Sequence, residues 1–162
     1  MLFFTPNPAP GRRFHQTVTI VLVAVFLWFP AFSADTPPLS PRLIIGTHHF
    51  TVEEARTPAQ LEQGLMWRDH LAPDHGMLFI FPKPQVARMW MKDTRISLDM
   101  LFIDTAGKVL YIAHNTEPEN YTTITAGVPV KAVLELPGGT CKKKGINVGD
   151  KVDHAVFDGT HP

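Results

Sequence analysis

Six polar and aromatic side chains could carry chemistry, because they stand in or beside apolar stretches of the chain. A lysine follows a tryptophan by two residues and precedes an aspartate by seven, which offers an aromatic platform with an ammonium and a carboxylate as handles. A polar side chain in an apolar run is costly unless it has a partner or a function. The candidate ligand-binding residues are Arg68, Trp90, Lys92, Thr94, Asp99 and Glu135.

Strand alternation indicates which of these side chains share a face. Every second residue of a strand points to the same side, which puts Trp90, Lys92 and Thr94 together. Glu135 stands in a further apolar run, and Arg68 is a possible partner for its charge. If these groups and the nearby aspartate converge at one end of the fold, they make a site for a carboxylate, a sugar or a peptide end.

The same residues allow two other interpretations. In the first, the stem of Lys92 packs on Trp90 and its charge is neutralised by Asp99 or Glu135, so that the cluster only stabilises the fold. In the second, Asp99 and Glu135 are the acid and base of a hydrolase or lyase on an envelope polymer, with Lys92 stabilising charge. The separation of the two carboxylates decides that chemistry, and the sequence does not supply it.

Sulfur-containing residues give a weaker option. Met89 and Met91 are spaced to share one face of a strand, and thioether sulfur suits Cu(I). Methionine is also ordinary core filler, which we favour here, and the single cysteine, Cys141, is interpreted as a buried apolar residue. The chain has no nucleophile elbow, phosphate loop, dinucleotide fingerprint or paired-cysteine zinc motif, so no cofactor or metal is predicted.

Residues 1–34 have the pattern of a secretory signal peptide. Arg12 and Arg13 precede an apolar run, Val18–Phe32, and small residues follow it. The run is slightly shorter than a membrane span, so a retained anchor is the alternative, and only then would the protein contact a membrane. We therefore predict a periplasmic or secreted protein.

The remaining chain is long enough for one domain with a substantial core. Residues 35–41 read as a proline-rich tether and residues 42–158 as a single globular domain. With 15 basic and 15 acidic residues, the chain has no excess charge to recruit nucleic acid. We expect a monomer whose partner is a small molecule, a glycan or a peptide.

Local patterns predict few helices. Thr57–Gln60 has the threonine, proline and glutamine of a capping box, and the helix that it begins should end near Trp67. Gly64 weakens this helix, which indicates a close approach by neighbouring backbone. Thr140–Lys144 could form one further helical turn before Gly145.

Short apolar segments between turn signals predict about eight strands. The prolines at 82 and 84 should end one of them. The expected fold is mainly β, at the margin of α+β: an antiparallel β-sandwich or flattened barrel with one short covering helix. The predicted strands cover residues 42–45, 49–55, 77–81, 86–92, 99–103, 108–112, 131–136 and 151–157.

Five sequence blocks resemble the signature of domain-of-unknown-function family 192, a prokaryotic family of small and often exported domains. The resemblance runs in order from Val52 to Val152 and implies one mainly-β domain with no established activity. It places all six candidate residues on recurrent polar and aromatic positions of the family. Asp93 stands where the family usually has asparagine, and Ser97 where it usually has proline. The blocks are Gly64–Arg68, Gly76–Phe79, Trp90–Thr94, Leu98–Asp104 and Leu134–Gly139.

Overall fold

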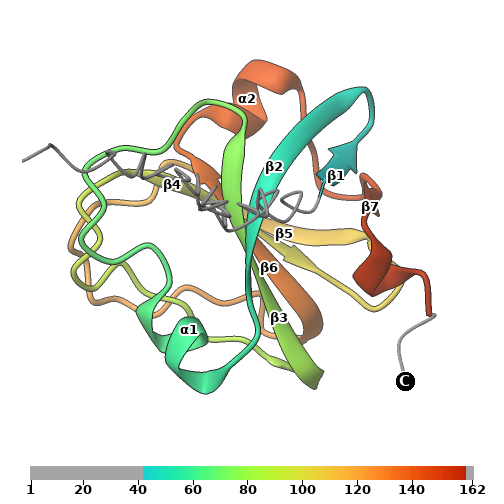
Figure 1. Cartoon of the computed structure of the whole chain (residues 1–162), viewed down its shortest axis with the longest axis horizontal. Coiled ribbons are helices and arrows are strands. Elements are labelled where there is room, and N and C mark those ends of the chain that lie inside the picture. The colour runs from blue at the N-terminus through green and yellow to red at the C-terminus, as the bar shows by residue number, and fades with distance from the viewer. Residues whose placement is uncertain (1–41, 160–162) are drawn as a thin grey trace, which may run out of the picture. The chain divides into compact units, whose positions relative to one another are not determined.

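The computed structural model describes residues 42–159, whose seven strands form one curled, mixed sheet (Figure 1). The strand order is β5-β4-β6-β3-β2-β1-β7, and only β2 and β3 pair in parallel. The predicted mainly-β fold is confirmed, and its form is a half-barrel. The strands are β1 (Arg42–Ile45), β2 (His48–Ala55), β3 (His75–Val86), β4 (Leu98–Ile103), β5 (Val109–Ala113), β6 (Pro129–Pro137) and β7 (Val152–Asp153).

The two outer strands approach each other at one end of the sheet. Beside β5, the backbone N–H of Val109 donates to the carbonyl of Asp150 at 2.9 Å. The N–H of Gly149 donates to the carbonyl of Val109 at 2.8 Å, and that of Val152 in β7 donates to Gly107 at 2.7 Å. These bonds partly close the curl of the sheet. They also satisfy backbone N–H and C=O groups of the two edge strands that would otherwise face water.

Both faces of the sheet are covered, so its central strands are apolar on both sides. One core includes Leu101 and Leu134 together with Cys141. The other includes Phe79 and Met100, and the segments that flank the candidate pocket pack against it. This second face therefore positions the pocket described below.

Helix α1 (Pro58–Gln63) begins as the sequence predicts. The Thr57 hydroxyl accepts from the N–H of Gln60 at 3.3 Å, and the Gln60 side chain accepts from the N–H of Thr57 at 3.0 Å, which confirms the capping box. The helix ends at Gly64, earlier than predicted. Gly64 has a φ of +47°, and a Cβ there would lie 2.8 Å from the ring of Phe79, so the close approach comes from a side chain rather than from backbone.

Helix α2 (Thr140–Lys144) confirms the predicted helical turn, and Gly145 follows it with a left-handed φ of 67°. Figure 1 shows α1 and α2 at different ends of the sheet. A 3-10 helix, η1 (Ala155–Phe157), follows β7, so the predicted strand over 151–157 is much shorter than expected.

Strand β3 differs most from its predicted extent. It continues through Pro82 and Pro84 to Val86, because a register shift against β6 between Ile80 and Gln85 leaves the prolines outside regular pairing. The predicted strand over residues 86–92 was wrong. Only an isolated bridge between Met89 and Ile124 forms there, and the segment otherwise follows an irregular path over the core.

The predicted signal peptide (1–34) and tether (35–41) lie outside the described residues. Within residues 42–159 the structure contains no helix with the length and apolar character needed to cross a membrane.

Candidate ligand-binding pocket

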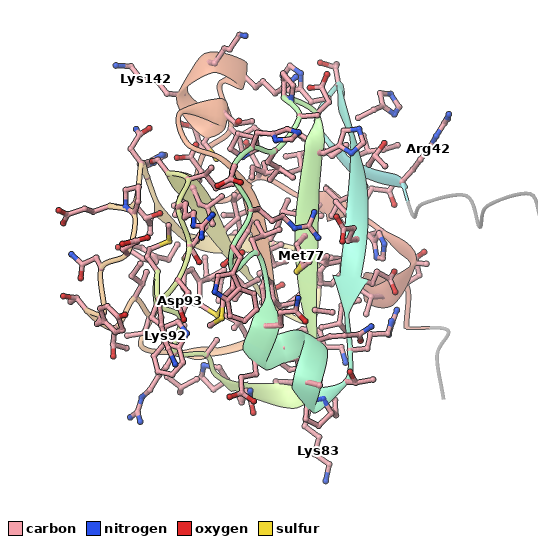
Figure 2. All side chains as sticks on the ribbon, turned by 60° about the vertical axis from the view of Figure 1, so that its left-hand side comes forward. Arg42, Met77, Lys83, Lys92, Asp93 and Lys142 are labelled. Carbon is pink, nitrogen blue, oxygen red and sulfur yellow. The ribbon has the colours of Figure 1, made fainter. Side chains whose placement is uncertain are left out.

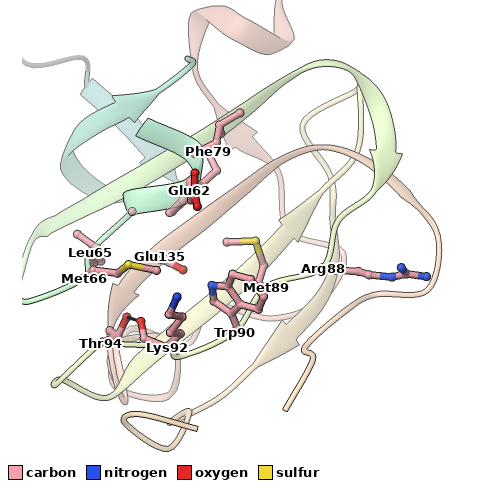
Figure 3. A pocket seen from close by; sticks show the side chains of 12 residues that line it. Glu62, Leu65, Met66, Phe79, Arg88, Met89, Trp90, Lys92, Thr94 and Glu135 are labelled. Carbon is pink, nitrogen blue, oxygen red and sulfur yellow. Dashed lines mark hydrogen bonds between the residues drawn. The ribbon is translucent and has the colours of Figure 1, made fainter. Parts of the chain in front are cut away.

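A pocket of about 100 Å³ opens between α1, the turn that follows it and the irregular segment 88–94 (Figure 3). The pocket brings together four of the six candidate residues from two separate parts of the chain. These residues are Trp90, Lys92, Thr94 and Glu135. Leu61, Leu65 and Phe79 add apolar wall, and Met66 and Met89 add thioethers.

Two turns hold the pocket walls together. The N–H of Trp67 donates to the carbonyl of Asp93 at 2.8 Å, and both residues have a left-handed φ, 63° and 53°. Asparagine and aspartate tolerate this conformation better than most residues, so Asp93 suits a turn in which its backbone carbonyl accepts the hydrogen bond. Arg95 reinforces the same junction through an ion pair with Asp69 at 2.9 Å. The segment carrying Lys92 is thus anchored to the turn after α1.

Glu135 lies at the floor of the pocket. It is only 4% exposed, and the residues beside it on the two neighbouring strands are Met77 of β3 and Met100 of β4. Its carboxyl has no hydrogen bond or ion pair with residues 42–159. Among these residues, every side-chain oxygen or nitrogen that is completely inaccessible to solvent has a hydrogen-bond partner. The carboxyl oxygens must therefore reach the pocket. Burial raises the pKa of Glu135 to about 8, so the group is mostly protonated at neutral pH.

Lys92 and Trp90 form the outer side of the pocket. Figure 3 shows the Lys92 side chain beside the indole and directed toward Glu135, whereas Arg88 extends away from them. The ammonium has no ion pair among the described side chains, and the indole is 49% exposed. The pocket therefore presents one cation and one buried acid that are not bonded to each other.

Arg68 does not reach this pocket. Its guanidinium binds both carboxylate oxygens of Glu53 at 2.6 Å, and this hydrogen bonding raises the pKa of Arg68. The pair lines a neighbouring hollow beside Gly64 and Met77. The expected pairing of Arg68 with Glu135 is therefore absent, because Glu53 on β2 is the nearer carboxylate.

Asp99 is also separate from the pocket. Because Met100 is the residue of β4 opposite Glu135, Asp99 faces the other side of the sheet. Its oxygens accept the N–H groups of Asn115 at 2.8 Å, Gly139 at 3.1 Å and Cys141 at 2.7 Å. The expected convergence of Asp99 with Glu135 does not occur, and neither does the acid–base pair based on it. Figure 2 shows Lys92 well away from Lys142 on α2, the helix beside Asp99.

The comparisons with known proteins match this fold and its residues to an uncharacterised family. The family model described as "Uncharacterized ACR", domain-of-unknown-function family 192, matches residues 42–154. The chain belongs to this family. The resemblance seen in the sequence blocks is thereby confirmed. A comparison with curated proteins found no match.

Two crystal structures resemble this domain of family 192. One, from Sinorhizobium meliloti 1021, is of a protein proposed to be a transcription regulator; it is 44% identical, has a TM-score of 0.70, and the match covers 72% of this chain and 94% of that one. The other, of a protein of unknown function from Novosphingobium aromaticivorans, is 40% identical with a TM-score of 0.67 and covers 69% of this chain and 83% of that one.

One group of possible metal ligands occurs among residues 42–159. Polar atoms of Asp99, His114 and Cys141 lie within 4.8 Å of one another. Asp99 already accepts three backbone N–H groups, and burial together with Asp99 raises the pKa of the Cys141 thiol to about 12. The arrangement favours a neutral thiol that donates to a carboxylate.

The two methionines considered for copper belong to different environments. Met91 is fully buried, and its sulfur accepts a hydrogen bond from the Thr116 hydroxyl at 3.1 Å. Met89 instead lines the pocket, where the second thioether comes from Met66. The Met89–Met91 spacing therefore does not place two free sulfurs at one site.

Sequence reasoning missed the part of the pocket that comes from the turn after α1 and from β3. Met66 and Phe79 line it, although their residue types suggest only core packing. The available signal was their position in two family-192 blocks, Gly64–Arg68 and Gly76–Phe79, which the structure brings against Trp90–Thr94.

Proposed function

We propose that this family-192 chain is a small binding domain whose ligand occupies the pocket between α1 and segment 88–94. The observation that carries the proposal is the Glu135 carboxyl, which is buried, reaches the pocket and has no partner among residues 42–159. Burying such a group costs free energy, whereas a ligand that hydrogen-bonds to it recovers part of that cost.

The other walls support the same function. Binding sites for small molecules combine apolar surface with a few directed polar groups, and buried titratable groups with shifted pKa values gather at such sites. Here Phe79 and the Trp90 indole supply surface, and Lys92 with Glu135 supply polar ends. A dry cavity of about 150 Å³ accepts benzene, which has six non-hydrogen atoms, so this smaller pocket encloses a group of about four non-hydrogen atoms.

Nuclear magnetic resonance of the full-length, ¹⁵N-labelled protein tests this proposal. We expect members of a panel of small acids, amines, alcohols and sugars to shift the indole N–H signal of Trp90, which Trp90→Phe assigns. Trp67 is the matched control, because it is 56% exposed and lies on the neighbouring turn outside the pocket. If no compound shifts Trp90 more than Trp67, the pocket is not a binding site.

We further propose that the domain is exported, on the basis of the N-terminal basic patch and apolar run. Fractionation of cells that express the full-length chain should recover it outside the cytoplasm, and mass spectrometry should show loss of about the first 34 residues. Recovery of the intact chain in the cytoplasm would contradict export, and recovery of the intact chain in the membrane would support an anchor.

An acid–base enzyme is the second candidate. It is favoured by the pKa of about 8 at Glu135, which suits proton transfer near neutral pH, and by the adjacent Lys92 charge. In that case Glu135→Gln abolishes turnover of a bound compound while binding persists.

The regulator role proposed for the Sinorhizobium protein is not carried over, because a chain of zero net charge has no positive electrostatic field to attract DNA.

A further inference from the structure

We propose that the ligand of this pocket is a short-chain carboxylate, with its oxygens between the Lys92 ammonium and the Glu135 carboxyl and its hydrocarbon part against Trp90. This inference rests on the binding function proposed above and adds the chemical class of the ligand. It follows from the charge, the hydrogen-bonding state and the size of the pocket.

Lys92 determines the charge that a ligand meets. Of the other charged residues of the lining, Arg88 extends away, and Glu62 on α1 forms no ion pair with Lys92 (Figure 3). The Arg68–Glu53 ion pair lies beyond Met77 and is neutral as a unit. On β3 and β4, the neighbours of Glu135 are the uncharged Met77 and Met100. Because Lys92 forms no ion pair with a described side chain, its ammonium is available to pair with an anionic group of a ligand.

Glu135 strengthens this preference when it is protonated. Its pKa of about 8 leaves an O–H group that can donate to a ligand at neutral pH. A carboxylate that receives this O–H and the Lys92 N–H forms two charge-assisted hydrogen bonds, which are stronger than neutral ones. An amine would need Glu135 to ionise in a buried position and would face the ammonium. A neutral alcohol would gain no charge-assisted bond.

The apolar walls limit the rest of the ligand. Leu65 and Phe79 lie on the helix side, and Trp90 lies opposite them (Figure 3). Leu61 of α1 also lines the pocket. With a pocket of about 100 Å³, the enclosed part of the ligand has about four non-hydrogen atoms. Butanoate is slightly larger than this and combines a carboxylate with a short hydrocarbon chain.

The first experiment compares butanoate, butylamine and 1-butanol, which share a hydrocarbon chain and differ in charge. Each is titrated into the ¹⁵N-labelled full-length protein near pH 7, with the Trp90 indole signal as the measurement. We expect saturable binding of butanoate, at least tenfold tighter than that of the other two. Equal binding of 1-butanol overturns the carboxylate proposal, and tighter binding of butylamine does so while leaving the binding function intact.

The second experiment assigns the interaction to Lys92. Lys92→Met should weaken butanoate binding at least tenfold, whereas Lys92→Arg should retain part of it. Lys142→Met is the matched control, because it removes the same charge from an exposed residue on α2, away from the pocket. Equal effects of Lys92→Met and Lys142→Met would show only general charge attraction and overturn the proposal.

The third experiment uses pH. If binding requires protonated Glu135, butanoate affinity should fall about tenfold between about pH 7 and about pH 9, and Glu135→Gln should remove this dependence. The same pH profile in wild type and Glu135→Gln would exclude Glu135 as the donor. Failure of all three probes to shift Trp90 overturns the carboxylate proposal, and failure of the wider compound panel as well overturns the binding function.

Discussion

Asp99 and Glu135 are two buried carboxyl groups on neighbouring strands, yet their surroundings are opposite. Asp99 faces one side of the sheet and accepts three backbone N–H groups, which fix the start of α2 and the loop at Asn115. Glu135 faces the other side and has no hydrogen-bonding partner among residues 42–159. The same kind of residue in the same kind of apolar strand thus stabilises the fold in one place and remains available in the other.

The difference shows that burial alone does not identify a functional acid. A carboxylate whose oxygens accept backbone N–H groups contributes stability, whereas a buried carboxyl without donors lowers stability and is available to a ligand. Hydrogen-bond partners, rather than the apolar neighbours in sequence, separate the two cases. Four changes test this comparison.

The largest expected effect comes from replacing each carboxyl by its isosteric amide. Asp99→Asn places an amide NH₂ among backbone N–H donors and removes charge-assisted hydrogen bonds. We therefore expect this variant to lower the free energy of unfolding by about 3 kcal/mol. Glu135→Gln should leave the free energy of unfolding unchanged or raise it. Urea unfolding of both full-length variants measures the difference, and equal losses would remove the distinction between the two carboxyls.

The pH dependence of stability should differ between wild type and Glu135→Gln. Because burial raises the folded-state pKa of Glu135 to about 8, the folded state binds the proton more tightly than the unfolded state. Wild type should therefore lose about 2 kcal/mol relative to Glu135→Gln as the pH rises from about 6 to about 8. Parallel unfolding curves over this range would contradict the raised pKa.

Replacing Glu135 by an apolar residue should stabilise the protein. Glu135→Met keeps a similar volume beside Met77 and Met100 and removes the cost of burying a polar group. We expect a gain of about 1.5 kcal/mol in the free energy of unfolding at neutral pH, together with loss of ligand binding. A large loss of stability instead would mean that Glu135, like Asp99, supports the fold.

The smallest effect is expected at the Arg68–Glu53 pair. Its side chains are 36% and 53% exposed, so solvent screens the interaction despite its two short hydrogen bonds. Arg68→Met should lower the free energy of unfolding by about 0.5 kcal/mol and leave butanoate binding unchanged. A marked loss of binding would place Arg68 in the site after all.

The sequence predicts local features well, because they depend on neighbouring residues. The capping box at Thr57 is set by contacts within a few positions, and it is confirmed. The turn at Thr140–Lys144 is also confirmed, although Asp99 from a distant strand holds its first N–H groups. The pairing of Arg68 and the faces of Asp99 and Glu135 depend on which strands are neighbours and on their register, since a shift of one residue moves a side chain to the other face. A single sequence does not contain that register.

The irregular segment was missed for a related reason. Residues 86–92 alternate like a strand, and their apolar side chains, such as Ala87 and Met91, are buried in the core. The backbone that carries them, however, does not extend the sheet. Periodicity reports which residues are buried and not what they pair with. The pocket exists because this segment leaves the sheet, so the least predictable part of the chain supplies Trp90 and Lys92.

Gly64 sets the width of the cleft. Its missing methyl group lets the ring of Phe79 lie directly beneath the end of α1, at 2.8 Å from where a Cβ would be. Any larger residue would lift the helix or tilt the ring, and either movement would change the gap that separates both from the indole. The absence of a side chain at Gly64 therefore sets the distance between the helix and the indole, and a substitution at this position is a direct way to change which ligands fit.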